Sequence, residues 1–173
     1  MKNADDFATN AWTAMCDLYR APAVSQLCVH LQDEYGVDVP LMLLMFYADQ
    51  QKIGMEIKDL DAFLTDAASW REDVVKPLRT IRQGMKGRYT GHDEVQLRDA
   101  VKALELRAEQ VHVSRLARSF LRHARPTEPR QMCDAYLLGY GVPEDERVAV
   151  LRVFQTAVDD AHIQDHDEER RLL

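Results

Sequence analysis

The clearest pattern in the chain is a pair of expected helices in residues 27–48, which read LCVHLQDEYGVDVPLMLLMFYA. The first has an apolar stripe, and Gly36 stands where a left-handed helix end belongs. Asp38 then occupies an N-cap position, and Pro40 fits the first turn of the second helix because no N–H is needed there. This second helix is apolar on nearly every side, and such a segment does not remain in water. The hairpin therefore predicts a compact helical core.

Apolar positions at helical spacing continue along the chain and predict an all-α fold. We expect a compact bundle of about six to eight helices, with a first helix near residues 5–19 and the longest near residues 93–123. The residues of this longest helix expected to face inward are Val95, Leu97, Val101, Leu104, Ala108, Val111, Leu116 and Phe120.

A proline interrupts one of these stripes. Trp70, Val74, Leu78, Ile81 and Met85 recur every three or four residues, and the stripe passes through Pro77. Proline inside a helix removes one hydrogen bond and clashes with the preceding turn. The segment is therefore expected to be kinked there, or broken with the proline starting a new helix.

The stretch ARPTEPR, at residues 124–130, stops the long helix and precedes a C-terminal helical pair. Apolar residues in this pair need a surface to bury against, so it is expected to pack on the long helix and the rest of the bundle as part of one domain. The terminal QDHDEERRLL carries no stripe, which is typical of a frayed end. The expected organisation is a core domain over 1–125, a helical pair over 126–164 and a flexible tail over 165–173.

Composition places the chain among single-domain globular proteins. Its 173 residues are 46% hydrophobic, and 7 glycines and 6 prolines leave little room for the many turns of an all-β fold. The longest apolar run, residues 41–48, is far below the roughly 20 residues that span a bilayer. Three dispersed cysteines give neither a disulfide framework nor a zinc pattern. With acidic residues where a signal peptide would be apolar, we expect a cytoplasmic protein that does not engage a membrane.

Charge is unevenly distributed around the net value of −7. Residues 1–70 carry 4 Lys/Arg against 11 Asp/Glu, residues 71–130 carry 14 against 8, and residues 131–173 carry 4 against 10. The basic middle segment can pair with the acidic flanks inside the molecule, or it can present a surface to an anionic partner.

Several stretches together resemble an uncharacterised proteobacterial family of small helical proteins of unknown function. They are the early Trp12, LCVHLQDEYGVDVPLMLLMF at 27–46, WREDVVKPLRTIRQGMK at 70–86 and LRDAVKALELRAEQ at 97–110. The resemblance covers roughly residues 10–120 in order and spacing. It implies an α-helical bacterial cytosolic protein, and it supplies no activity, cofactor or catalytic residue.

A polar stripe on the long helix is the main candidate for chemistry. Its members recur every three or four residues, and two arginines of the preceding segment lie three apart. The candidate binding residues are Arg79, Arg82, Arg98, Lys102, Glu105 and Glu109. They can form a solvated face with ordinary ion pairs, an internal network across the bundle, or a site for a small anionic ligand.

The spacing Glu109-x-x-His112 matches the motif by which helical bundles bind paired iron or manganese. A dimetal site also needs a second such motif and further inward carboxylates, and the chain has no second Glu-x-x-His. Glu109 and His112 are therefore weak metal candidates, and no cofactor is expected.

A second basic stripe lies near the end of the long helix. Lysine or arginine near a helix C-terminus is favoured by the helix dipole. Because the whole chain is acidic and shows no basic recognition helix, nucleic acid is the disfavoured partner. The residues of this stripe are Arg115, Arg118, Arg122 and Arg125.

The absence of catalytic signatures in the sequence, beside strong helical patterning, favours a non-enzymatic interaction or regulatory protein. It would bind a protein partner through a groove between helices or through the basic middle segment. The alternative is a small-molecule- or metal-dependent enzyme that uses Glu105, Glu109 and His112.

Overall fold

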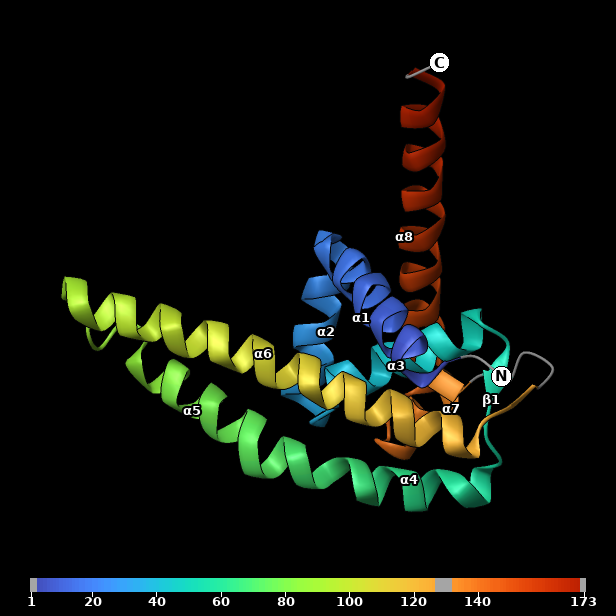
Figure 1. The fold of residues 1–173 in the computed structure, drawn as a ribbon, viewed down its shortest axis with the longest axis horizontal. Coiled ribbons are helices and arrows are strands. Elements are labelled where there is room, and N and C mark those ends of the chain that lie inside the picture. The colour runs from blue at the N-terminus through green and yellow to red at the C-terminus, as the bar shows by residue number, and fades with distance from the viewer. Residues whose placement is uncertain (1–2, 127–131, 172–173) are drawn as a thin grey trace. The chain divides into compact units, whose positions relative to one another are not determined.

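The computed structural model describes residues 3–126 and 132–171, and the chain is helical almost throughout them (Figure 1). This confirms the expected all-α fold. The helices are α1 (Ala4–Arg20), α2 (Pro22–Tyr35), α3 (Val39–Gln50), α4 (Ile57–Trp70), the π-helical η1 (Arg71–Val75), α5 (Lys76–Met85), α6 (His92–His123), α7 (Met132–Gly139) and α8 (Glu144–Arg171).

The helices fall into two compact units. Unit 1 comprises Met1–Trp12 and Met55–Arg125, and unit 2 comprises Thr13–Gly54 and Pro126–Leu173. Helix α1 contributes its first half to unit 1 and its second half to unit 2. The domain boundaries expected from the sequence stay a prediction.

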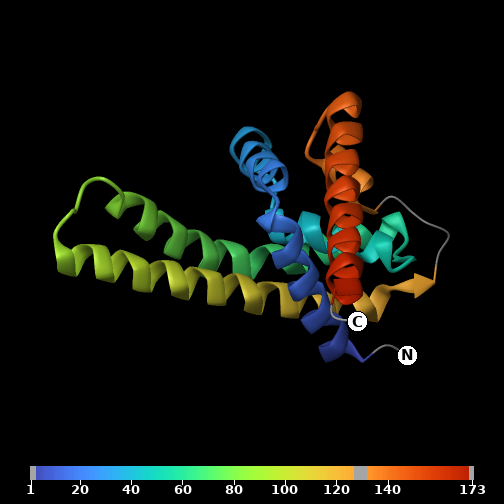
Figure 2. The same cartoon turned by 90° about the horizontal axis from the view of Figure 1, so that it is seen from above.

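Unit 1 is built on α6, which packs against α4, η1 and α5 in turn. Both views of the ribbon show α5 alongside the first half of α6 (Figures 1 and 2). Near the other end of α6 an aromatic cluster forms the apolar centre, with the Phe120 ring centroid 5.9 Å from that of Phe63 and 6.3 Å from that of Phe7. All three rings are buried, as expected for large apolar side chains.

The chain passes Pro77 without a break because a π turn precedes it. The Lys76 N–H bonds to the carbonyl of Arg71, five residues earlier, and Pro77 then lies in the first turn of α5, where no N–H is needed. One extra residue in a turn rotates all later side chains by about 100° relative to an uninterrupted α-helix. The stripe expected from the sequence is therefore interrupted, and Ile81 is 53% exposed.

In the first half of α6, the buried residues differ from those predicted. Leu97 and Leu104, predicted to face inward, are 58% and 56% exposed. In the second half of the helix, Leu116 and Phe120 are buried as predicted. The difference arises because α5 meets α6 on its polar stripe, and the leucines lie on a neighbouring face.

Unit 2 is organised around the apolar helix α3, which contacts α7 and α2, while α8 contacts α2 and α7. Gly36 has φ 71° at the end of α2, and the Asp38 side chain caps α3 by accepting a hydrogen bond from the Leu41 N–H. The rings of Phe46 and Phe154 meet edge to face at 5.2 Å. These features match the hairpin expected from residues 27–48.

The C-terminal helices extend differently from their expected bounds. Helix α8 runs to Arg171, beyond residue 164, where the expected helical pair ends. Helicity does not test mobility, so the flexible tail over 165–173 stays a prediction. Residues 127–130 of the ARPTEPR stretch lie outside the described residues.

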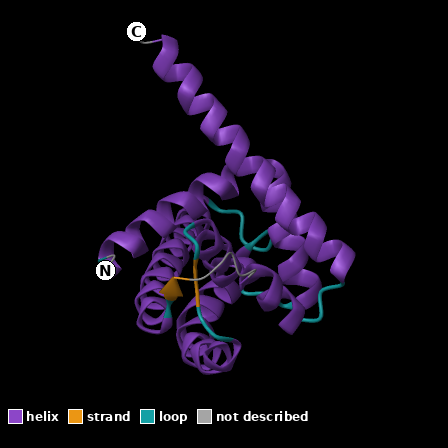
Figure 3. Ribbon diagram, turned by 90° about the vertical axis from the view of Figure 1, so that its right-hand side faces the viewer, coloured by secondary structure: helices purple, strands orange, loops and turns teal. Residues whose placement is uncertain are grey.

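Strands are minimal in the part of the chain that the structure describes. Two-residue strands β1 (Ile53–Gly54) and β2 (Arg125–Pro126) form one small sheet, and Figure 3 shows helices everywhere else apart from loops. The only non-glycine residue with positive φ among the described residues is Lys52, at 54°, next to β1.

Candidate functional site

The polar stripe of α6 faces α5 and holds the two helices together by ion pairs. Arg79 donates from Nε to Glu105 Oε1 at 3.0 Å and from Nη2 to Glu109 Oε1 at 2.6 Å. Arg82 donates from Nε to Glu105 Oε2 and from Nη2 to Glu105 Oε1, the second bond at 3.2 Å. Both oxygens of Glu105 are thus engaged in a fork-to-fork arrangement.

Burial makes this network unusual for an ion-pair cluster. Glu105 is 5% exposed, and the side chains of Arg79 and Glu109 are each about one-fifth exposed. Burial by itself raises the pKa of the Glu105 carboxyl, but hydrogen bonds from Arg82 and Arg79 outweigh it and the net pKa is lowered. Glu105 is therefore held as a carboxylate, and a charge in this position needs its partners.

The two other basic members of the stripe lie outside the network. Arg98 is half-buried and reaches the neighbouring Asp99 at 3.4 Å, and Lys102 is exposed. The structure thus gathers Arg79, Arg82, Glu105 and Glu109 into one internal cluster. Whether any of the six predicted residues binds a ligand stays a prediction.

The two weak metal candidates, Glu109 and His112, have different surroundings. Glu109 accepts a hydrogen bond from Arg79, whereas His112 is buried, with 1% of its surface exposed. Among the described residues, no group of three or more His, Cys, Asp or Glu side chains is arranged to hold a metal ion. Metal binding by Glu109 and His112 receives no support from this arrangement.

The sequence identified an apolar stripe on α6 but not that its outer part is exposed; we define the apolar seam as Leu97, Val101, Leu104, Ala108 and Val111. Their spacing of four, three, four and three residues is the a/d repeat of a coiled coil. The first three are exposed or half-buried, and Ala108 is buried where the seam approaches the core. The repeat was visible in the sequence, but its exposure depends on where α5 lies.

The seam is anchored at its inner end by Trp70, the last residue of α4. The indole Nε1–H donates to the Ala108 carbonyl at 3.0 Å, and the Arg115 guanidinium lies 5.3 Å from the indole centroid. A cation over an indole face is attracted by the ring quadrupole. These contacts connect the π turn and α5 firmly to α6.

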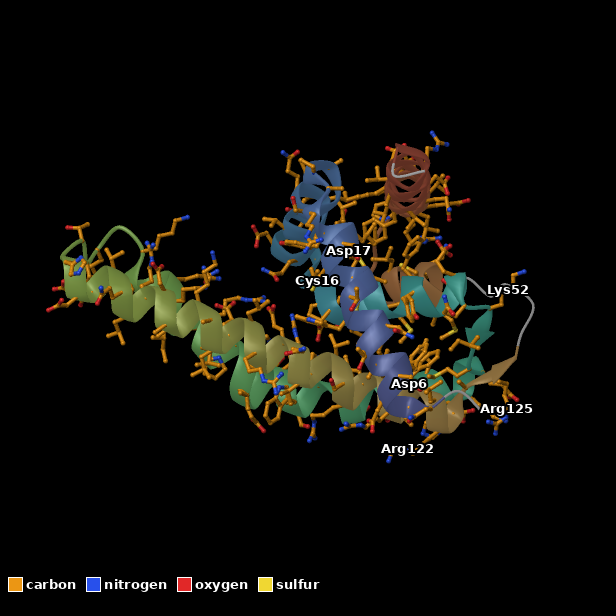
Figure 4. The ribbon with its side chains drawn as sticks, turned by 45° about the horizontal axis from the view of Figure 1, so that its top comes forward. Asp6, Cys16, Asp17, Lys52, Arg122 and Arg125 are labelled. Carbon is orange, nitrogen blue, oxygen red and sulfur yellow. The ribbon has the colours of Figure 1, made fainter. Side chains whose placement is uncertain are left out.

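Several arginines of the second basic stripe make contacts within unit 1. Arg118 pairs with Asp5 at 2.9 Å, which joins the end of α6 to the start of α1. Figure 4 labels Asp6 and Arg122 at these same two helix ends. Arg115 lies over Trp70, and Arg125 donates to the Ala124 carbonyl at 3.0 Å, so three of the four arginines have intramolecular contacts that need no nucleic acid.

Unit 2 contains a groove between α1, α3 and α8 with a volume of about 330 Å³. Its lining is mostly apolar and includes two glutamines. The lining residues are Ala14, Met15, Leu18, Leu43, Phe46, Tyr47, Gln50, Gln51 and Val158. This inter-helix groove has no charged side chain in its lining, and whether a partner binds in it stays a prediction.

None of the helices, within the residues described, combines the length and the apolar character required to span a bilayer.

Comparison with known proteins bears on family alone. Comparison with curated proteins and with solved structures gave no match. A family model described as "Protein of unknown function (DUF2390)" matches residues 10–116, most of the chain and nearly the range of the resemblance noted in the sequence. The matched residues include α5, the seam and the whole ion-pair network. The chain belongs to this family of unknown function.

Proposed function

We propose that this protein is a non-enzymatic helical interaction module, and that it binds a protein partner through the α5–α6 pair of the basic middle segment. The observation that carries the proposal is the exposure of Leu97 and Leu104, at 58% and 56%, on a repeat that continues into the core. Single exposed leucines are common, but a repeat of them on one face of a helix is typical of an interaction surface. The bacterial, cytoplasmic setting expected from the sequence is part of the same proposal.

The rigidity of the surface supports an interaction role. Arg79 and Arg82 fix α5 to α6 through Glu105, and Trp70 fixes the base of the pair. A preformed surface loses little conformational freedom on binding, which favours affinity. The seam is therefore presented on a scaffold that does not need to fold around its partner.

The enzymatic alternative receives no comparable support. Glu105 and Glu109, its candidate acid–base groups, already accept hydrogen bonds from arginines. A general base must be free to take a proton from substrate, and a carboxylate whose pKa is lowered by two arginines is a poor one.

Site-specific photo-crosslinking in the cell tests the proposal. A photoreactive residue replaces Leu104 in one variant and Leu106 in the other. Both leucines are on α6 and have nearly equal exposure, 56% and 55%, but two residues of helix separate their directions by about 200°. We expect a discrete protein adduct from position 104 and none from position 106.

Comparing positions 104 and 106 also shows which crosslinking results would refute the proposal. Equal adduct patterns at 104 and 106 would mean that capture reflects exposure alone, and no protein adduct at 104 in cells expressing the full chain at native level would refute the proposal. Circular dichroism of both purified variants verifies that each retains the helical fold.

A further inference from the structure

We infer that the partner at the seam is a second copy of this chain, with the two α6 helices antiparallel about a two-fold axis near Ala100. This assignment rests on the proposed function and names the partner of the same surface. It depends on which side chains share the open side of α6, and on the groups that they would meet across such an axis.

Five exposed residues form one narrow face in the first half of α6. At 100° per residue they lie within about 80° of one another around the helix. Glu105 and Glu109, which bind the arginines of α5, lie about 120° and 160° from the middle of this face, so α5 packs on another side of α6. The five residues, which we call the free face, are Asp93, Leu97, Ala100, Leu104 and Arg107.

The free face is self-complementary along its length. Leu97 and Leu104 lie three and four residues on either side of Ala100. Asp93 and Arg107 lie seven residues on either side of it. An antiparallel copy therefore brings each leucine against the other leucine of its partner, and each Asp93 carboxylate beside an Arg107 guanidinium. Ala100 meets itself at the axis, where its small side chain lets the two helices approach.

These positions follow the coiled-coil repeat of the seam. Leu97 and Leu104 are core positions, and the flanking g positions are Asp93, Ala100 and Arg107. Charges at such flanking positions set partner choice and orientation. A parallel copy would gather both Asp93 side chains at one end and both Arg107 side chains at the other. The antiparallel copy instead pairs opposite charges at both ends, which is the favourable arrangement.

The other charges in this half of α6 favour neither a basic nor an acidic partner. Residues 92–109 carry 3 Lys/Arg against 5 Asp/Glu. Arg98 pairs with Asp99, and the carboxylates of Glu105 and Glu109 are bound by α5. Outside these pairs stand two charges of each sign, Asp93, Glu94, Lys102 and Arg107. With acid at one end of the free face and base at the other, the fitting partner carries the same charges in reverse order, as a second copy does.

The size of the free face makes this dimer weak and reversible. Residues 93–107 span about 21 Å of helix at about 1.5 Å per residue, and each copy contributes two leucines. Small interfaces of this kind belong to the transient class. We therefore expect a dissociation constant between about 1 and about 100 µM.

Analytical ultracentrifugation of the full-length protein tests the dimer, from about 1 to about 500 µM and at low salt. We expect reversible monomer–dimer exchange. Leu104→Ser should raise the dissociation constant at least about tenfold, and Leu106→Ser, equally exposed on another side of α6, should leave it unchanged. A chain that stays monomeric to about 500 µM, or a dimer that both substitutions weaken equally, would overturn the inference.

Exchanging the two end charges tests the antiparallel arrangement. Asp93→Arg alone places like charges at both ends of the pair, as does Arg107→Asp alone, and each should raise the dissociation constant about tenfold. Mixing the two variants restores opposite charges at both ends, so the mixture should associate within about threefold of the wild type. Failure of the mixture to recover, with circular dichroism showing both variants folded, would refute the arrangement about Ala100.

Photo-crosslinking at position 104 separates this inference from the proposed function when it is repeated on the purified protein at about 100 µM. We expect an adduct with the mass of two copies of the chain from position 104 and none from position 106. Absence of this adduct in the purified protein, beside an adduct to a different protein in cells, would leave the proposed function standing and refute the second copy as the partner.

Discussion

The Nε atom of Arg79 lies 3.0 Å from Oε1 of Glu105, in the centre of the α5–α6 contact where apolar side chains usually meet. Because the polar stripe is used to hold α5, the adjacent leucines are left at the surface. The exposed seam is thus a direct consequence of the buried charges.

We predict that Glu105→Gln lowers the free energy of unfolding by about 3 kcal/mol, since it leaves the partly buried Arg82 without its carboxylate and Arg79 with Glu109 alone. The folded pKa of Glu105 is below its ordinary value of 4.5, so its stabilisation is complete above that pH and is lost as the pH falls through the lowered pKa. Urea unfolding of both proteins from pH 7 to pH 3 measures this. A stability difference that grows toward acid pH would contradict the assignment.

Replacing the network by apolar residues separates a structural from a binding role. We predict that Arg79→Met, Arg82→Met and Glu105→Leu combined restore most of the stability that Glu105→Gln removes, because apolar groups of similar volume can substitute for a buried ion pair. Thermal unfolding gives the comparison. If the combined variant is as stable as the wild type and still yields the adduct at position 104, the network acts only as scaffold.

The π turn sets the register of α5. We predict that deleting the exposed Asp73 converts the turn to α-helix and rotates α5 by about 100°, which withdraws Arg79 and Arg82 from Glu105. The variant should lose about 3 kcal/mol of stability. Adding Glu105→Leu to the deletion should then recover stability, whereas the same substitution in the wild-type chain should not.

The exposure of Leu97 and Leu104 predicts that the outer part of the seam contributes little to the free energy of unfolding. Leu104→Ser should change the free energy of unfolding by less than about 0.5 kcal/mol, as is usual for surface positions. Leu116→Ala, in the buried part of the same helix, should lower it by about 3 kcal/mol. Chemical denaturation of the two variants measures the contrast, and a large loss for Leu104→Ser would place that residue in the core.

Asp49 makes the stability of unit 2 depend on pH in the opposite direction to Glu105. Its carboxylate accepts the Met132 and Cys133 N–H groups at 2.9 and 3.0 Å, and burial, which outweighs these bonds, raises its pKa to about 6. A raised folded pKa means that stability from this group is greatest below its ordinary pKa and is lost as the pH rises to about 6. We predict that Asp49→Asn removes this decline.

Denaturation between pH 4 and pH 7 measures the effect of Asp49→Asn, which should amount to at most about 3 kcal/mol across the range. Asp134→Asn is the control, because Asp134 raises the pKa of Asp49 only as a minor influence. Parallel profiles for the wild type and Asp49→Asn would show that Asp49 does not titrate in this range.

Local physical chemistry made much of the fold predictable. Gly36 and Asp38 end and begin helices because of their own backbone and side-chain preferences, and both do so in the structure. The apolar character of α3 fixed its place in a core for the same reason, since no packing arrangement can leave it in water. The candidate polar residues were also found, because their spacing puts them on one side of a helix.

The sequence by itself determined most of the helices, the caps at Gly36 and Asp38, and the existence of a polar stripe beside an apolar one, because these follow from neighbours along the chain. It did not determine which stripe meets α5. That choice depends on the π turn before Pro77, which rotates Arg79 and Arg82 onto Glu105 and leaves Leu97 and Leu104 exposed. Only tertiary structure could decide it, because ion pairing between residues more than twenty positions apart competes there with burial of the leucines.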